Sequence, residues 1–214
     1  RELDKLDKKR DDAGPLLARV KVAQAATIER DGDLDSATAI YAEALALAPD
    51  DFAVLSARIT LDVNMRRWHE ATAAITAFVS TDPPPPLPVR LAALMRQAEI
   101  HADGEMDSQR AITVLREVIR QDPGHEHAYY LLAQEWFALG RYADARAAID
   151  RVIELAAAPG SAIAPESLAR YYYYRGRITE VGGDARAATS QYRRACEYDP
   201  GYAPPALALA RRAA

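Results

Sequence analysis

A regular spacing of prolines after apolar helical stretches is the feature of this sequence that most restricts its fold. Pro49 and Pro83 lie 34 residues apart, Pro123 follows 40 residues later, and Pro200 follows after another 77. Proline ends helices because it lacks an amide hydrogen and its ring clashes with the preceding turn. A period near 34 residues is typical of chains built from repeated pairs of helices. The spacing therefore predicts an all-helical repeat architecture.

Two insertions explain why the later intervals are longer than the first. Pro83 to Pro86, followed by Pro88, cannot form a regular helix, so we expect this segment to run extended between two repeats. Residues 158–165 form a second insertion, and Pro165 stands where the first residue of a helix belongs. Both insertions are predicted to lie between repeats rather than inside a helix.

Residue types also recur within the period. A large residue is followed by Leu and a small residue, an aromatic, Gly, an aromatic, Ala and bulky residues, most clearly at Tyr129, Leu132, Ala133, Trp136, Gly140, Tyr142, Ala145, Ile149 and Val152. This pattern resembles the tetratricopeptide repeat (TPR). Small residues let two helices approach closely, and Gly32, Gly140 and Gly183 can supply the positive φ that ends a helix.

The resemblance implies a right-handed, all-α solenoid of antiparallel helix pairs, a TPR-like superhelix with a C-terminal capping helix. We expect one such solenoid over residues 18–214, after a charged lead-in helix or linker at 1–17. About five repeats are predicted, at residues 18–51, 52–85, 89–124, 126–159 and 167–202, with the cap at 203–214. Two depart from the pattern: Arg58 and Asp62 occupy apolar positions of the second, and the turn near Gly104 lengthens the third.

Composition argues against several classes of partner. Half of the residues are hydrophobic and 27% are charged, as in globular proteins. The chain has 27 Lys and Arg against 31 Asp and Glu, so it lacks the basic field that nucleic acid requires. No run of 18 or more apolar residues occurs, so we expect no membrane insertion by this segment. Its Ala, Arg and Asp content suggests a soluble bacterial segment, cytoplasmic or periplasmic, with the compartment left open.

No motif for catalysis, metal binding or cofactor binding stands out. His125 and His127 are two residues apart and point to different sides of a helix, whereas helical metal sites use ligands four residues apart. Glycine-rich phosphate loops and nucleophile elbows are missing from the sequence. We therefore predict no catalytic residues, no metal and no cofactor. The alternative of a ligand sensor or enzyme would depend on His127, Arg170, Arg177 and Glu180.

The resemblance also implies a place for partner binding, because the first helices of TPR pairs line the concave groove. In the last two predicted repeats these positions carry mainly aromatic and basic side chains: His127, Tyr130, Gln134, Phe137, Arg170, Tyr173 and Arg177. Tyr and Arg are enriched at binding hot spots. We expect a bound peptide or partner domain with apolar anchors near Tyr130 and Phe137 and a carboxylate near Arg170 or Arg177. The competing interpretation is that these aromatics only fill gaps between repeats or meet the terminal helix.

Four consecutive tyrosines, Tyr171 to Tyr174, are the most unusual local feature. Successive helical residues point 100° apart, so the four are not expected to share one role. Tyr172 matches a core position of the repeat, and Tyr173 matches a groove position.

The first two repeats offer no comparable surface. Their groove positions are mostly small: Arg19, Val22, Ala26, Glu29, Ala53, Ser56, Thr60 and Val63. The Lys and Asn residues with which chaperone-binding members hold a carboxylate are missing there. We therefore predict a non-catalytic scaffold or adaptor with a protein or peptide partner. The alternative is a self-association module of a larger bacterial complex, in which the face after Pro200 or the charged start forms a homo-oligomer.

Overall fold

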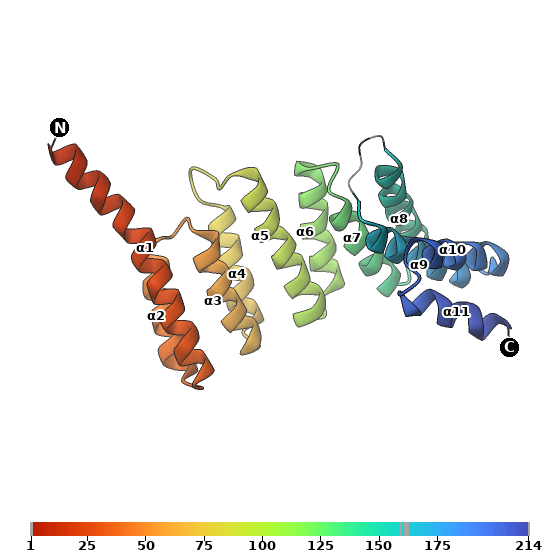
Figure 1. Cartoon of the computed structure of the whole chain (residues 1–214), viewed down its shortest axis with the longest axis horizontal. Helices are drawn as coiled ribbons and strands as arrows, with labels where there is room; N and C mark the ends of the chain where they lie inside the picture. Colours follow the sequence, from red (N-terminus) through yellow and green to blue (C-terminus); the bar gives the residue numbers. More distant parts are fainter. Residues whose placement is uncertain (1, 159, 161–162, 214) are drawn as a thin grey trace. The chain divides into compact units, whose positions relative to one another are not determined.

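The computed structural model describes residues 2–158, 160 and 163–213, and all regular structure in these ranges is helical (Figure 1). This confirms the predicted all-α class. The helices are α1 (Glu2–Arg30), α2 (Leu34–Leu47), α3 (Phe52–Asn64), α4 (Trp68–Val79), α5 (Leu87–Glu99), the π-helical turn η1 (Ile100–Gly104), α6 (Ser108–Gln121), α7 (Glu126–Ala138), α8 (Tyr142–Ala157), α9 (Pro165–Val181), α10 (Ala185–Tyr198) and α11 (Ala203–Ala213).

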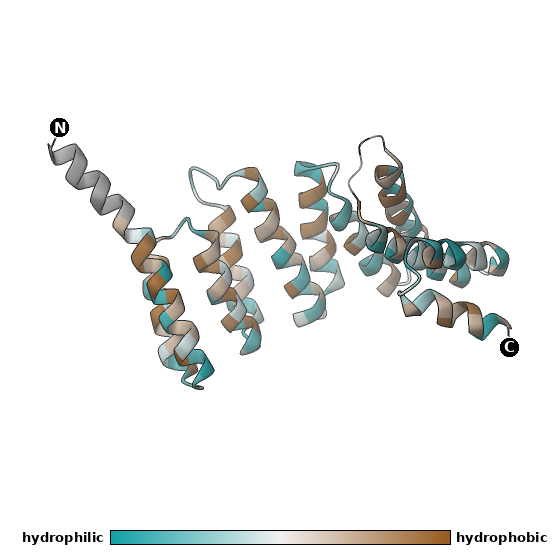
Figure 2. Cartoon of the chain, in the orientation of Figure 1, coloured by the Kyte–Doolittle hydropathy of each residue, from teal (hydrophilic) through white to brown (hydrophobic). Residues whose placement is uncertain are grey.

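The helices form two compact units, residues 1–106 and 107–214. In unit 1, helices α1 to α5 pack on one another in chain order, and in unit 2 helices α6 to α11 do the same. Figure 2 shows apolar and polar residues alternating along these helices, as expected for helices that bury one face. Each unit is therefore a stack of antiparallel helices.

Tight turns of one kind join the two helices of a pair. Gly32, Gly140 and Gly183 have φ of 92°, 72° and 86°, which confirms their predicted role. At the first of these turns, the Asp33 amide donates to the Ile28 carbonyl and the Gly32 amide donates to the Glu29 carbonyl, as in a Schellman cap. Arg66 takes the same position after α3 with φ of 58°, although a non-glycine residue there is strained.

The second helix of most pairs begins at an aspartate. Asp33, Asp107 and Asp184 each accept a hydrogen bond from the backbone amide three residues later, at 2.9–3.0 Å. These caps satisfy amides that have no partner inside the helix. The charge also favours the positive end of the helix dipole.

The cores combine alanine at close helix contacts with larger side chains around them. In unit 1 one cluster contains Leu55, Ile59, Ala71, Ile75, Phe78, Ala93 and Ile100. In unit 2 the fully buried Tyr192 lies against Gly176, where an added Cβ would be 2.6 Å from Tyr192 Cδ1. Glycine at 176 is therefore required for α9 and α10 to pack at this distance.

Two regions depart from an ideal repeat. Helix α1 runs from Glu2 through Pro15 to Arg30, so the charged start continues into the first predicted repeat without a break. Helix α5 continues into η1, which accommodates the extra residues expected near Gly104. The third predicted repeat has α5 in unit 1 and α6 in unit 2, and the repeat boundaries stay a prediction.

Candidate partner-binding surface

Helices α7 and α9 carry all seven residues of the predicted groove. His125 caps the start of helix α7, and its Nδ1 accepts a hydrogen bond from the Ala128 amide at 3.2 Å. This cap explains one histidine of the sequence pair without a metal. Helix α9 begins at Pro165, whose fixed φ suits the first turn of a helix.

The predicted groove residues differ in exposure. His127 and Arg170 are exposed, whereas Tyr130, Phe137 and Tyr173 are partly buried. The same is true of Gln134 and Arg177. The side chains that reach farthest into solvent are therefore polar, and the aromatic ones present only part of their surface.

Four aromatic side chains from α7 and α9 form what we term the α7/α9 aromatic cluster: Tyr130, Phe137, Tyr171 and Tyr174. The Tyr130 ring centroid lies 5.0 Å from that of Tyr171 and 5.8 Å from that of Tyr174, and Phe137 lies 5.6 Å from Tyr174. Such tilted and edge-to-face contacts are favourable. The cluster packs α7 against α9, so part of these aromatics fills the space between repeats.

Tyr173 belongs to a second group of rings. Its centroid lies 5.7 Å from that of Tyr192 in α10 and 5.7 Å from that of Tyr202, the residue just before α11. The predicted groove residue therefore also meets the start of the terminal helix, as the competing interpretation expected. It keeps partial exposure.

The two predicted arginines lie beside these rings without an acidic partner. The Arg177 guanidinium carbon is 4.8 Å from the Phe137 ring centroid and 5.5 Å from that of Tyr174. Neither Arg170 nor Arg177 forms an ion pair with any residue in the described ranges. Cation–π contact holds Arg177 in place but leaves its charge available to an anion.

The pKa shifts of the phenols reflect the proximity of Tyr130, Tyr202, Arg170 and Arg177. Burial raises the pKa of Tyr130 to about 12, and the Tyr202 phenol adds to the rise while Arg170 and Arg177 oppose it. Burial also raises the pKa of Tyr202, again opposed by Arg170 and Arg177. The surface thus combines neutral phenols with two guanidinium groups, which suits recognition of a carboxylate.

The comparisons with known proteins agree with the helix arrangement. A family model described as tetratricopeptide repeat matches residues 104–174. The chain has the tetratricopeptide-repeat fold.

Several solved structures are similar to this chain. MamA from Desulfovibrio magneticus RS-1 is 16% identical with a TM-score of 0.62, and the match covers 86% of this chain and 96% of that one. PilF from Pseudomonas aeruginosa is 16% identical with a TM-score of 0.60, covering 98% and 93%. YrrB, a TPR protein with an unusual peptide-binding site, is 15% identical with a TM-score of 0.56, covering 88% and 89%. No curated protein matches.

The family match over residues 104–174 and the likeness to solved structures agree with the predicted TPR fold. TPR proteins are generally non-catalytic scaffolds whose partners are other proteins, because stacked helix pairs present an extended binding surface. None of the helices in the described ranges is long and apolar enough to cross a bilayer.

Sequence reasoning missed three aromatics of this TPR surface. Tyr171 and Tyr174 both contact Tyr130, whereas Tyr172 stacks on Tyr198, so the four consecutive tyrosines do not share one role. The separation of three residues between Tyr171 and Tyr174 was the available signal. Tyr202 could not be placed from the sequence, because its position depends on how the segment before α11 packs on α9.

Of the four residues considered for an enzyme, Glu180 is engaged in structural contacts. Glu180 accepts a hydrogen bond from the Tyr192 hydroxyl at 2.6 Å and pairs with Arg212 of α11. In the described ranges, no three His, Cys, Asp or Glu side chains are grouped to hold a metal ion. Glu180 of α9 therefore links this helix to α10 and to α11.

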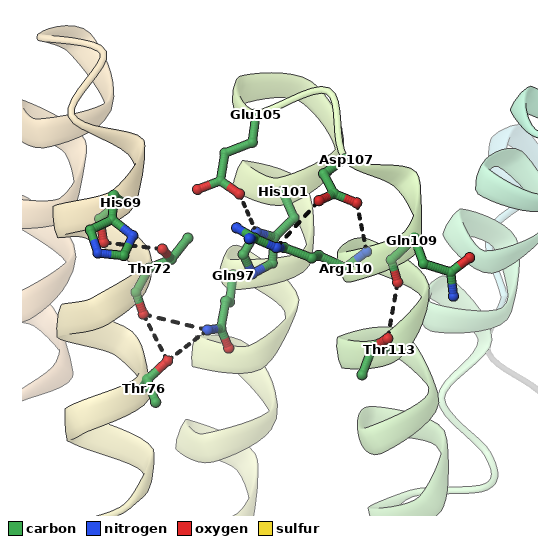
Figure 3. Close-up of polar contacts among 10 residues, drawn as sticks. All are labelled: His69, Thr72, Thr76, Gln97, His101, Glu105, Asp107, Gln109, Arg110 and Thr113. Carbon is green, nitrogen blue, oxygen red and sulfur yellow. Dashed lines mark hydrogen bonds and ion pairs between the residues drawn. The ribbon is translucent and has the colours of Figure 1, made fainter.

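Unit 1 has a separate set of partly buried polar contacts in α4, α5 and η1 (Figure 3). Gln97 Nε2 donates to Thr76 Oγ1 at 2.8 Å and to the Thr72 carbonyl at 3.4 Å. One turn further along, His101 Nδ1 lies 2.8 Å from Glu105 Oε2. Gln97 therefore links α5 to α4, whereas the His101–Glu105 contact lies within η1 and the residue that follows it.

Proposed function

We propose that this chain is a protein-interaction scaffold that binds an acidic and aromatic peptide segment on the exposed side of α7 and α9. The observation that carries the proposal is the pair Arg170 and Arg177, which have no acidic partner in the described ranges and lie beside partly buried aromatic rings. By contrast, Arg146 and Arg175 of unit 2 both form ion pairs with Asp150.

The chemistry favours a peptide with two features. A guanidinium can donate two parallel hydrogen bonds to one carboxylate, and stacking on Phe137 limits the entropy that Arg177 loses when it does so. The exposed edges of Tyr130 and Tyr173 offer contact for an apolar or aromatic side chain. Similarity in fold to YrrB, which has a peptide-binding site, supports this use of the scaffold.

Selection from a phage-displayed random peptide library tests the proposal. We expect the native chain to enrich peptides that combine Asp or Glu with an aromatic residue. The double variant Arg170→Ala/Arg177→Ala should reduce affinity for those peptides at least about tenfold, the equivalent of one charge-assisted contact. The matched control is Arg186→Ala/Arg193→Ala, two exposed arginines of α10.

Two results would contradict the proposal. One is that the selection enriches no peptide although the native chain is correctly folded. The other is equal loss of affinity in the control variant, which would indicate a general charge effect. Self-association through the terminal helix stays a prediction.

A further inference from the structure

The segment Pro83–Pro86 between α4 and α5 is an exposed, extended stretch of four prolines. Pro83, Pro84 and Pro86 are exposed, and Leu87 after them is 42% exposed. Pro86 has φ of −51° and ψ of 143°, close to polyproline II values. Figure 1 shows this segment as a loop that connects the end of α4 to the start of α5. Pro86, at the end of the stretch, therefore has the extended backbone of polyproline II.

Hydrogen bonds hold both ends of the stretch and leave its centre open. Thr81 Oγ1 donates to the Pro83 carbonyl at 3.2 Å, and the Arg90 amide donates to the Pro86 carbonyl at 3.0 Å. The carbonyls of Pro84 and Pro85 accept no hydrogen bond from the described residues. Polyproline II has no internal hydrogen bonds, so these two carbonyls are available to a partner's donors.

A pocket of about 240 Å³ lies alongside the prolines and has an acidic rim. It is lined by Asp50, Thr81, Asp82 and the four prolines. Asp50 and Asp82 are both exposed, and neither forms an ion pair with a described residue. Two carboxylates on one small pocket favour a cationic side chain.

We propose that Pro83–Pro86 is a docking segment for a protein domain with an aromatic-lined groove of the kind that accepts polyproline II. A basic side chain at the edge of that groove enters the pocket between Asp50 and Asp82. Proline-rich ligands bind well because little conformational entropy is lost when an already extended segment is bound. This interaction lies in unit 1 and is independent of the surface proposed for peptide binding in unit 2.

A panel of purified polyproline-binding domains tests the proposal: one SH3 domain, one WW domain and profilin. Binding to the whole chain is measured by titration calorimetry. We expect at least one domain to bind, with affinity reduced about tenfold or more in Pro84→Ala/Pro85→Ala. Pro123→Ala, which changes an exposed proline in another turn, should bind as the native chain does. Asp82→Asn should weaken binding and reduce its dependence on salt.

The outcomes separate docking from a purely structural linker. A linker predicts that none of the three domains binds, and that result would overturn the proposal. Equal affinity for the native chain and Pro84→Ala/Pro85→Ala would overturn it as well. A measurement of the amide chemical shifts of Asp82 and Leu87 in the native chain needs no variant. A domain that binds Pro83–Pro86 must perturb these shifts. Perturbation confined to other residues also counts against the proposal.

Discussion

Replacing Gly176 by Ala tests the close packing of α9 against α10. An added Cβ would be 2.6 Å from Tyr192 Cδ1 and closer still to Cε1. Tyr192 is fully buried and its hydroxyl donates to Glu180 at 2.6 Å, so the ring cannot move freely. Overpacking costs about 1–3 kcal/mol, and a displaced ring also weakens the bond to Glu180 by about 1 kcal/mol.

Alanine at this position also has a stabilising effect, which offsets part of the loss in the free energy of unfolding. It favours a helix interior over glycine by about 1 kcal/mol. We therefore expect Gly176→Ala to lower the free energy of unfolding of unit 2 by about 2 kcal/mol. Urea titration followed by Trp136 fluorescence measures this, in a Trp68→Phe background so that the single tryptophan reports on unit 2 alone.

A second background decides whether the cause is the contact with Tyr192. Tyr192→Val removes the ring atoms that the new Cβ would meet. If the clash is responsible, Gly176→Ala becomes neutral or stabilising in that background, because only the helix propensity remains. An equal loss of stability in both backgrounds would refute the reasoning.

Two further predictions concern other packed sites. Because the raised pKa values of Tyr130 and Tyr174, about 12 in each case, mean that folding favours the neutral phenols, unit 2 should lose stability as pH rises from 10 towards 12. Urea titrations across this range measure the loss, and an unchanged slope in Tyr130→Phe would argue against it. In unit 1, Gly104→Ala places a Cβ 2.8 Å from Trp68 Cε3 and should cost about 1–3 kcal/mol and shift Trp68 emission. Gly124→Ala, whose Cβ meets nothing closer than 3.4 Å, is the control, and equal effects of both substitutions would contradict the packing argument.

Much of the fold could be predicted because its signals are local. Gly32, Gly140 and Gly183 mark turns that require positive φ, and that requirement belongs to each residue's own backbone. The same turn at Arg66 was not predicted, since a residue that tolerates strain carries no signature in the sequence. Asp62 likewise broke the apolar pattern, and the structure shows it buried beside Arg58 at 2.9 Å.

The sequence by itself determined the helical period, the turns and the face of α7 and α9 on which Tyr130, Phe137 and Arg177 lie, because a helix places residues three and four apart together. Only the tertiary structure decided how exposed those side chains are. Tyr171 and Tyr174 pack on Tyr130, and Tyr202 meets Tyr173, because these rings come from different helices or segments and meet only when the chain packs. Among the described residues, Arg170 and Arg177 form no ion pair and lie beside partly buried rings, a property that depends on packing between helices.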